Sequence, residues 1–215
     1  HLNGVSVQTG AVAVSVVETS GPIYGTVWQS GEDWDLDAGE GLLNGWWDTE
    51  ALAISGDGVA VAGSADLRAA FWPSRVADGI QYLEGEVNFP YSRATGLSDG
   101  ADRVVGISSS TEGPETPGLS GAAFFWSRET GFLALPDLLT RAGIGFAGWD
   151  LDTPSDVLHI SGDGTTLVGL GTNPDGDPEV WRVVLPSLAS IPLPAQAPIV
   201  FSPFSISVGE TGIIS

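Results

Sequence analysis

The fold is decided by a stretch that occurs three times: AISGDGVAVAG at residues 53–63, GLSDGADRVVG at residues 96–106 and HISGDGTTLVG at residues 159–169. In each copy an apolar pair runs into a turn of Ser, Gly and Asp. Glycine there supplies the positive φ that a tight hairpin needs, and aspartate can hydrogen-bond its own backbone. Apolar residues then recur with period two, as in a half-buried strand. Each copy therefore predicts a β-hairpin.

Further strands are expected after each hairpin. An aromatic or β-branched run ends in tryptophan at Trp72, Trp126 and Trp181, and a fainter copy of the unit ends at Trp28. Two of these runs precede a glycine-led apolar alternation, at residues 79–83 and 131–135, whereas the last unit lacks this closing strand. Such units expose apolar faces that only a neighbouring unit can bury. The sequence therefore predicts an all-β, propeller-like repeat domain over residues 1–185, with units at 4–51, 52–94, 95–158 and 159–185. Helix is expected only at residues 136–142.

The repeat resembles a known family. The pattern Ile-Ser-x-Asp-Gly-x-x-Val-Val-Gly, followed by Ala-Phe-x-Trp or Phe-Trp and then Gly-Phe-x-x-Leu, is similar to the HAF repeat of bacterial extracellular proteins. The resemblance covers residues 52–185 closely and residues 4–51 loosely. It implies a secreted, propeller-like β-repeat protein without an assigned catalytic centre.

The C-terminal segment has a different composition. Residues 186–203 hold five of the fourteen prolines, which favours extended, stiff backbone over sheet interior. Residues 204–208 then alternate again and predict one strand. We expect residues 186–215 to form a spacer and a terminal strand, which could complete the last unit or add to the edge of a neighbouring molecule.

Charge and composition exclude several classes of protein. The chain carries 27 Asp and Glu against seven basic residues, a formal net charge of −20. This composition argues against nucleic acid as a partner, since phosphate binding needs clusters of Lys and Arg. A bilayer span needs about 20 apolar residues, and no such stretch occurs, so no membrane insertion is expected. The absence of cysteine fits either an exported or an intracellular protein, whereas an acidic charge of this size suits the salty surroundings of an exported, extracellular or cell-surface protein.

Two short motifs mimic catalytic or cofactor sites. Residues 96–100 satisfy the Gly-x-Ser-x-Gly spacing of a nucleophile elbow, but the same serine recurs once in every unit and no helix is expected after it. Residues 143–148 satisfy Gly-x-Gly-x-x-Gly, but the expected helix precedes the glycines instead of opening on them. His159 stands where the other units have Ala53 and Gly96, so it is interpreted as a rim or packing residue. We expect a non-enzymatic protein.

An acidic pattern is the remaining candidate for a site. Carboxylates at Asp33, Asp35 and Asp37 alternate along one segment, and Asp150 and Asp152 repeat the core of the pattern. Alternation places them on one face, where a hard cation such as Ca²⁺ would relieve their repulsion. The other interpretation is a solvated surface, with Trp34 and Trp149 packed inward on the opposite face.

Two functions of different classes are consistent with these features. The first is a non-enzymatic exported protein acting in cell-surface, matrix or filament assembly, which associates with itself or with other surface proteins through strand addition from its C-terminal tail. The alternative is a carbohydrate-binding or carbohydrate-active propeller. It would use Trp46 and Trp47, because adjacent strand residues point to opposite faces and one of the two should leave the core.

Overall fold

The structure is a computed structural model that describes residues 2–5, 9–17, 23–36, 49–74, 79–83, 91–109, 120–151, 153–154 and 158–191. The described strands are β1 (Leu2–Val5), β2 (Val12–Val17), β3 (Ile23–Gln29), β4 (Glu32–Asp35), β5 (Thr49–Ile54), β6 (Val61–Ala65), β7 (Arg68–Trp72), β8 (Gln81–Tyr82), β9 (Tyr91–Leu97), β10 (Arg103–Ser109), β11 (Ser120–Ser127), β12 (Gly131–Ala134), β13 (Thr153–Pro154), β14 (His159–Ile160), β15 (Thr166–Thr172) and β16 (Pro178–Val184). The described helices are α1 (Leu135–Arg141) and a 3-10 turn, η1 (Leu188–Ser190).

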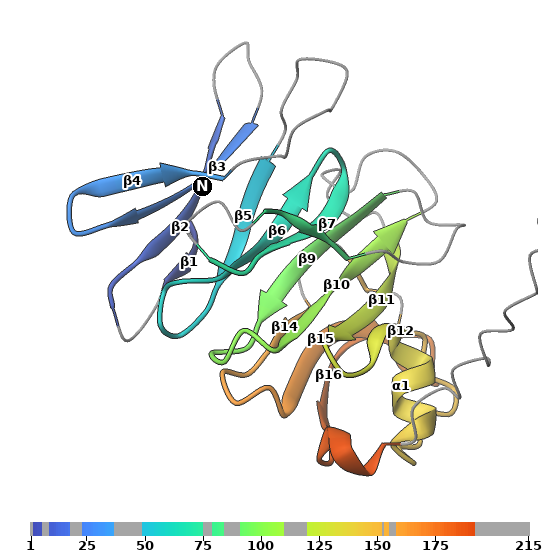
Figure 1. The fold of residues 1–215 in the computed structure, drawn as a ribbon. Helices are drawn as coiled ribbons and strands as arrows, with labels where there is room; N and C mark the ends of the chain where they lie inside the picture. Colours follow the sequence, from blue (N-terminus) through green and yellow to red (C-terminus); the bar gives the residue numbers. More distant parts are fainter. Residues whose placement is uncertain are drawn as a thin grey trace, which may run out of the picture.

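The strands form four antiparallel sheets that follow one another along the chain (Figure 1). The first sheet is β1-β2-β3-β4, the second β5-β6-β7-β8 and the third β9-β10-β11-β12, with β13 paired to β11. The last sheet is β14-β15-β16. Successive meanders of about four strands are the blades of a propeller. The prediction of an all-β, propeller-like repeat fold is confirmed.

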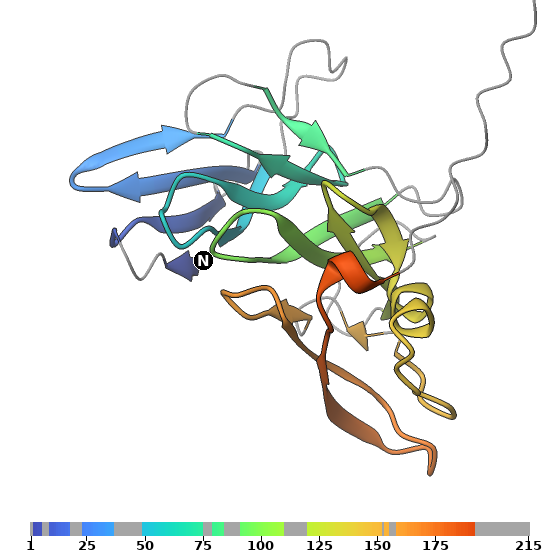
Figure 2. The same ribbon diagram turned by 60° about the horizontal axis from the view of Figure 1, so that its bottom comes forward.

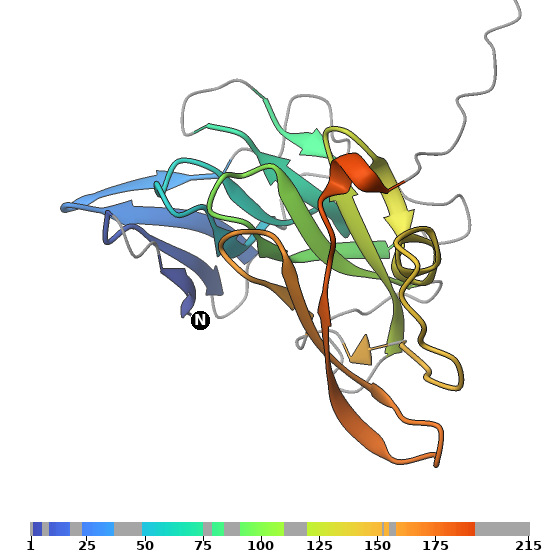
Figure 3. The same cartoon turned by 90° about the horizontal axis from the view of Figure 1, so that it is seen from below.

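The first strand of each unit holds neighbouring sheets together. Strand β5 lies against β2 and β3, β9 lies against β6 and β7, and β14 lies against β10. The first strands also lie beside one another, β1 with β5, β5 with β9 and β9 with β14. The sheets therefore fan out from a line of first strands, and the β3–β4 and β15–β16 hairpins project at the two ends of the fan (Figures 2 and 3).

The recurrent turns have the predicted chemistry. The Ser55 and Ser161 hydroxyls donate hydrogen bonds to Asp57 and Asp163, respectively. Each serine hydroxyl also accepts a hydrogen bond from the backbone N–H five residues further along the chain. The fourth turn residue has positive φ in all three copies, at Gly58, Ala101 and Gly164. The middle turn obtains its carboxylate two residues later, since Ser98 donates to Asp102.

Three apolar clusters lie between the four sheets, one at each contact between neighbouring sheets. The second sheet places Trp72 toward the first sheet and Phe71 toward the third, while the third sheet places Trp126 toward the second sheet and Phe125 toward the last. We call the face toward the next sheet the forward face and the opposite one the backward face. Both faces of the two inner sheets are covered, so β10 is a continuous buried run after Arg103 instead of an alternating one.

Tryptophan marks the backward face in every unit, although its register varies. Trp72 lies opposite Val61 and Trp126 lies opposite Val104, at the same position of the repeat. Trp181 lies opposite Gly169, two residues away from that position. The expectation that Trp181 shares the position of the other two is wrong in register, because its ring instead covers the glycine. It is right in direction, since Trp181 packs toward the third sheet.

The helix and the start of the tail complete the last cluster. Helix α1 begins one residue before the predicted range, with Pro136 in its first turn, and Gly143 follows it with φ of 70°. Leu188 and Ile191, in the segment expected to begin the spacer, are buried in the same cluster as Trp181. The rest of the tail, including the expected strand at 204–208, lies outside the described residues.

Candidate functional site

The forward face of the last sheet is open. Along β16, Trp181 is buried, whereas Val180 and Val184 are 62% and 52% exposed. Residues directly opposite each other on paired strands share a face. Val168 and Leu170 therefore join the valines, since they lie opposite Arg182 and Val180. We call Val168, Leu170, Val180, Arg182 and Val184 the last-sheet face.

The charge of the last-sheet face departs from that of the chain. Arg182 lies at its centre, and His159 joins it because it lies opposite Val168. Among the described residues of β14–β16, the single carboxylate is Glu179, which alternation places on the other face and which accepts a hydrogen bond from Asn173. This face is therefore apolar and basic in a chain of net charge −20.

The outer edge of β16 completes this surface. In the first two sheets, a carbonyl of the third strand accepts a hydrogen bond from the closing segment. The Leu36 N–H donates to the Gly25 carbonyl, and the Leu83 N–H donates to the Ala69 carbonyl. Val180 occupies the same position of the repeat in β16, so its backbone points away from β15. Within the described part of the chain the last sheet has no fourth strand to receive it. An unpaired edge of this kind can accept an added strand.

The backward face of the first sheet is the second open surface. Trp28 is 48% exposed there, although Trp72 and Trp126 are buried on the backward faces of their sheets. Asp33 lies directly opposite Trp28, and Asp35 lies opposite Thr26. We call Val12, Trp28, Asp33 and Asp35 the first-sheet face. It combines a large aromatic side chain with two carboxylates.

The predicted acidic residues lie at separate places. Asp33 and Asp35 are exposed on β4, and Trp34 between them packs inward, as the solvated-surface interpretation expects. Asp150 forms an isolated bridge with Thr172 of the last sheet, and Trp149 packs against the last cluster. Within the described ranges, no group of three or more His, Cys, Asp or Glu could hold a metal ion. The remaining predicted residues, Asp37, Asp152, Trp46 and Trp47, lie outside the described residues.

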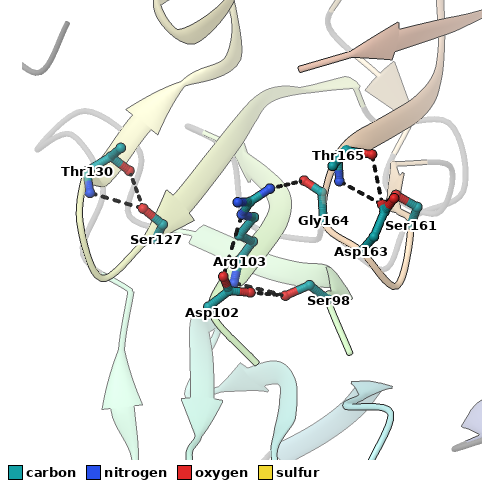
Figure 4. A network of polar contacts seen from close by, with 9 residues as sticks. All are labelled: Ser98, Asp102, Arg103, Ser127, Thr130, Ser161, Asp163, Gly164 and Thr165. Atoms are coloured by element: carbon teal, nitrogen blue, oxygen red, sulfur yellow. Dashed lines mark hydrogen bonds and ion pairs between the residues drawn. The ribbon is translucent and has the colours of Figure 1, made fainter. Parts of the chain in front are cut away.

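The recurrent turns lie side by side at one end of the sheets. The Asp99 N–H donates to the Gly162 carbonyl, and the Gly56 N–H donates to the Asp99 carbonyl. Arg103 reaches from the third unit to the last, where its Nη1 donates to the Gly164 carbonyl at 2.7 Å (Figure 4). The polar network thus joins units, and the serines that mimic a nucleophile elbow have their hydroxyls engaged within their own turns.

Asp163 accepts three hydrogen bonds within its own turn. The Ser161 hydroxyl, the Thr165 N–H and the Thr165 hydroxyl all donate to it, and they lower the pKa of its carboxyl from 3.8 to about 2 (Figure 4). The folded state thus stabilises the ionised carboxylate.

This shift predicts a pH dependence of stability. Because the folded pKa lies below the unfolded value, the contribution of Asp163 is present above about pH 4 and is lost as the pH falls toward about 2. Thr165→Val removes one donor and should raise the pKa of Asp163 toward 3.8, as measured by NMR titration of its carboxyl carbon. Thr140→Val, a remote control on α1, should leave that pKa unchanged. Wild-type titration of Asp163 at its ordinary pKa would contradict the bonding described.

A buried ion pair ties the second and third sheets together. Arg93 of β9 donates from Nη2 to Glu50 Oε1 at 2.9 Å, and its Nε lies 2.9 Å from Oε2. The Ser64 hydroxyl donates to the same carboxylate. Both charged side chains are mostly buried, so removing one partner leaves the other charge in a poor environment.

Arg93→Ala is therefore expected to lower the free energy of unfolding by about 2 kcal/mol, less than a fully buried pair because Glu50 retains some exposure. Chemical denaturation measures the change. Arg128→Ala, in the exposed β11–β12 turn, serves as the control and should change stability by less than about 0.5 kcal/mol. Equal effects of the two substitutions would show that the pair does not couple the sheets.

Of the residues that form the two open faces, Asp33 and Asp35 were predicted as site residues, and the others were not. The sequence of the last sheet carries no matching signal, because residues 178–184 (PEVWRVV) do not alternate in polarity. The open face is evident only in the burial of the folded strand, where buried Trp181 lies between exposed Val180 and Arg182. Placing Arg182 in register with Phe125 requires the strand pairing, which the sequence does not provide.

Comparisons with known proteins find no match in sequence and distant matches in structure. No family model matches the chain, and no curated protein matches it significantly. Among solved structures, TolB from Acinetobacter baumannii has a TM-score of 0.48 at 17% identity, with 87% of this chain and 44% of that one covered. A protein described as TolB from Agrobacterium tumefaciens has a TM-score of 0.48 at 15% identity, with 86% and 58% covered. The tricorn protease has a TM-score of 0.44 at 14% identity, with 75% and 14% covered.

The chain thus spans less than two thirds of the length of each of these three proteins. All three TM-scores are below 0.5, and the description of the fold rests on the four sheets of this chain. In the described residues, no helix is both long and apolar enough to cross a membrane.

Proposed function

We propose that the chain is a non-enzymatic, exported β-repeat protein that acts in cell-surface, matrix or filament assembly. One observation carries the proposal: the end sheets leave large apolar side chains exposed at repeat positions that are buried in the inner sheets, with Trp28 at 48% and Val180 at 62% exposure. An apolar face bounded by polar residues is typical of a surface that binds another protein.

The polar groups of the fold support a structural rather than a catalytic role. Ser55, Ser98 and Ser161 each accept a backbone N–H and donate to a carboxylate of the same turn. A catalytic serine needs a free hydroxyl beside a base. The proposed exported location rests on the strongly acidic composition.

Strand addition is the proposed mode of contact at the edge of β16. The last sheet has three described strands where each of the others has at least four, and the outward backbone of Val180 has the direction that binds the fourth strand in the first two sheets. The C-terminal tail of the same or a neighbouring molecule is the proposed donor. Backbone hydrogen bonds would supply affinity, and Val180 and Val184 would select the side chains.

Carbohydrate binding is the second candidate, and one observation favours it. Trp28 presents an aromatic ring to solvent beside Asp33, and aromatic rings beside carboxylates are able to stack on sugar rings while bonding their hydroxyls. A glycan array probed with wild type and Trp28→Ala tests it. Identical array patterns for the two proteins would remove this candidate for the described part of the chain.

The main proposal is tested by measuring mass and binding together. The full chain should form assemblies in sedimentation, or bind purified cell-surface or matrix material, with and without Ca²⁺. Val180→Glu combined with Val184→Glu should abolish either activity. Val59→Glu is the matched control, because Val59 is also an exposed valine but lies in the turn of the second unit. A chain that stays monomeric at high concentration and binds none of this material would refute the proposal.

A further inference from the structure

The forward faces of the four sheets are equivalent, position by position. The second strands contribute Ala13, Ala62, Val105 and Val168, and opposite them the third strands contribute Val27, Phe71, Phe125 and Arg182. In the first three sheets, both members of each pair are buried against the next sheet. The last sheet thus carries an arginine where the preceding two carry phenylalanine.

The contact between successive sheets also recurs in its hydrogen bonds. The Gly25 N–H donates to the Thr49 hydroxyl of the second sheet, and the Ala69 N–H donates to the Ser92 hydroxyl of the third. Gly25 and Ala69 occupy the same position of the repeat. One mode of sheet stacking is therefore used repeatedly, and the last sheet presents its forward half to solvent.

The first sheet presents the other half of this contact. Trp28 lies opposite Val12, as Trp72 lies opposite Val61 and Trp126 opposite Val104. The two inner tryptophans are buried by the preceding sheet, and Trp28 is 48% exposed. The backward face of the first sheet therefore has the tryptophan of the repeat but no preceding sheet among those described.

The two open halves differ from the internal contacts by charges of opposite sign. Arg182 replaces the phenylalanine of the forward face. On the backward face, Asp33 lies opposite Trp28 where Phe132 lies opposite Trp126 in the third sheet. The last-sheet face is thus apolar and basic, and the first-sheet face is apolar and acidic. Such complementarity selects one partner surface and disfavours the pairing of two like faces.

We infer that the last-sheet face of one molecule packs against the first-sheet face of a second copy, with Arg182 of the first facing Asp33 of the second. This inference rests on the proposed assembly function and names its partner. The contact repeats the internal stacking of sheets, so each molecule continues the fan of the previous one. Because the two faces differ, the contact is heterologous and produces a ring where the rotation closes and a fibre where it does not.

The experiment is sedimentation of the full chain over a wide concentration range at physiological salt. Wild type should shift from monomer to larger species as concentration rises. Arg182→Glu and Asp33→Arg should each weaken this association at least about tenfold, since each places like charges across the contact. The double variant Arg182→Glu/Asp33→Arg should recover most of it. Arg128→Glu, an equal charge change in the β11–β12 turn, should associate as wild type does, apart from the general effect of net charge.

The outcomes distinguish this inference from the proposed assembly function on which it rests. If neither Arg182→Glu nor Asp33→Arg affects assembly, the inference is wrong and the proposed assembly function stands. A wild-type protein that stays monomeric but binds surface or matrix material also overturns the inference and leaves the proposed function standing. If Arg182→Glu lowers the melting temperature of a monomer and Asp33→Arg restores it, the faces meet within one chain and no second copy is needed. Failure to associate or to bind any such material refutes both.

Discussion

Gly63→Ala is expected to lower the free energy of unfolding by at least about 4 kcal/mol and to leave little folded protein. A β-bulge between Ala51 and Ala53 carries the backbone of β5 over Gly63. A Cβ at residue 63 would collide with the Glu50 carbonyl and crowd the Leu52 nitrogen. These are backbone atoms in the middle of a sheet, so no rotation of a side chain relieves the collision.

The matched control is Gly145→Ala. Gly145 has ordinary φ, and a Cβ there meets nothing within 4 Å. Its substitution should change stability by less than about 0.5 kcal/mol. Circular dichroism during urea unfolding compares the two variants. A Gly63→Ala protein with the wild-type midpoint would show that the glycine of the repeat is not required by the bulge.

Phe125→Ala should cost about 3–5 kcal/mol, because it empties a fully buried site between the third and last sheets. The substitution should also loosen the last sheet before the rest, since Trp181 and Leu167 share that cluster. Hydrogen exchange of β15 amides would detect this local loss. Val180→Ala is the control, because it shortens a side chain on the open face of the same sheet and should cost less than about 0.5 kcal/mol. A similar loss of unfolding free energy for the two variants would contradict the assignment of one buried and one open face to the last sheet.

Much of the fold could be predicted from the sequence because its signals are local. The recurrent turns depend on hydrogen bonds spanning at most five residues, and all three copies form turns. The middle copy departs from the expected chemistry, because its positive φ is at Ala101 and its carboxylate comes from Asp102. Helix α1 was also predictable, since Pro136 lies in its first turn and Gly143 follows its C-terminal end with positive φ. Contacts between units could not be predicted. Arg93 pairs with Glu50, which lies 43 residues earlier in the chain, and neither sequence segment indicates its partner.

The candidate site was missed for a related reason. Arg182 is unremarkable in a list of seven scattered arginines, and it becomes informative only when strand register aligns it with Phe71 and Phe125. The same holds for Trp28. In the sequence it resembles the other tryptophans of the repeat, and only its exposure in the structure distinguishes it from the buried Trp72 and Trp126. The acidic alternation at Asp33 and Asp35 was read correctly as one face, whereas its opposition to Trp28 depends on pairing with β3.

The stacking of four sheets with two open ends is tested most directly by thiol labelling, because the chain has no cysteine of its own. Ala69, Ala123 and Val180 occupy one position in the second, third and last sheets. Each is replaced by cysteine in turn, and the rate of reaction with a thiol reagent is measured on dilute native protein. We predict that cysteines at 69 and 123 are protected and that a cysteine at 180 reacts almost as fast as a free thiol. Rapid labelling at 69 or 123, or protection at 180 in the monomer, would contradict the arrangement of covered inner sheets and an open last face.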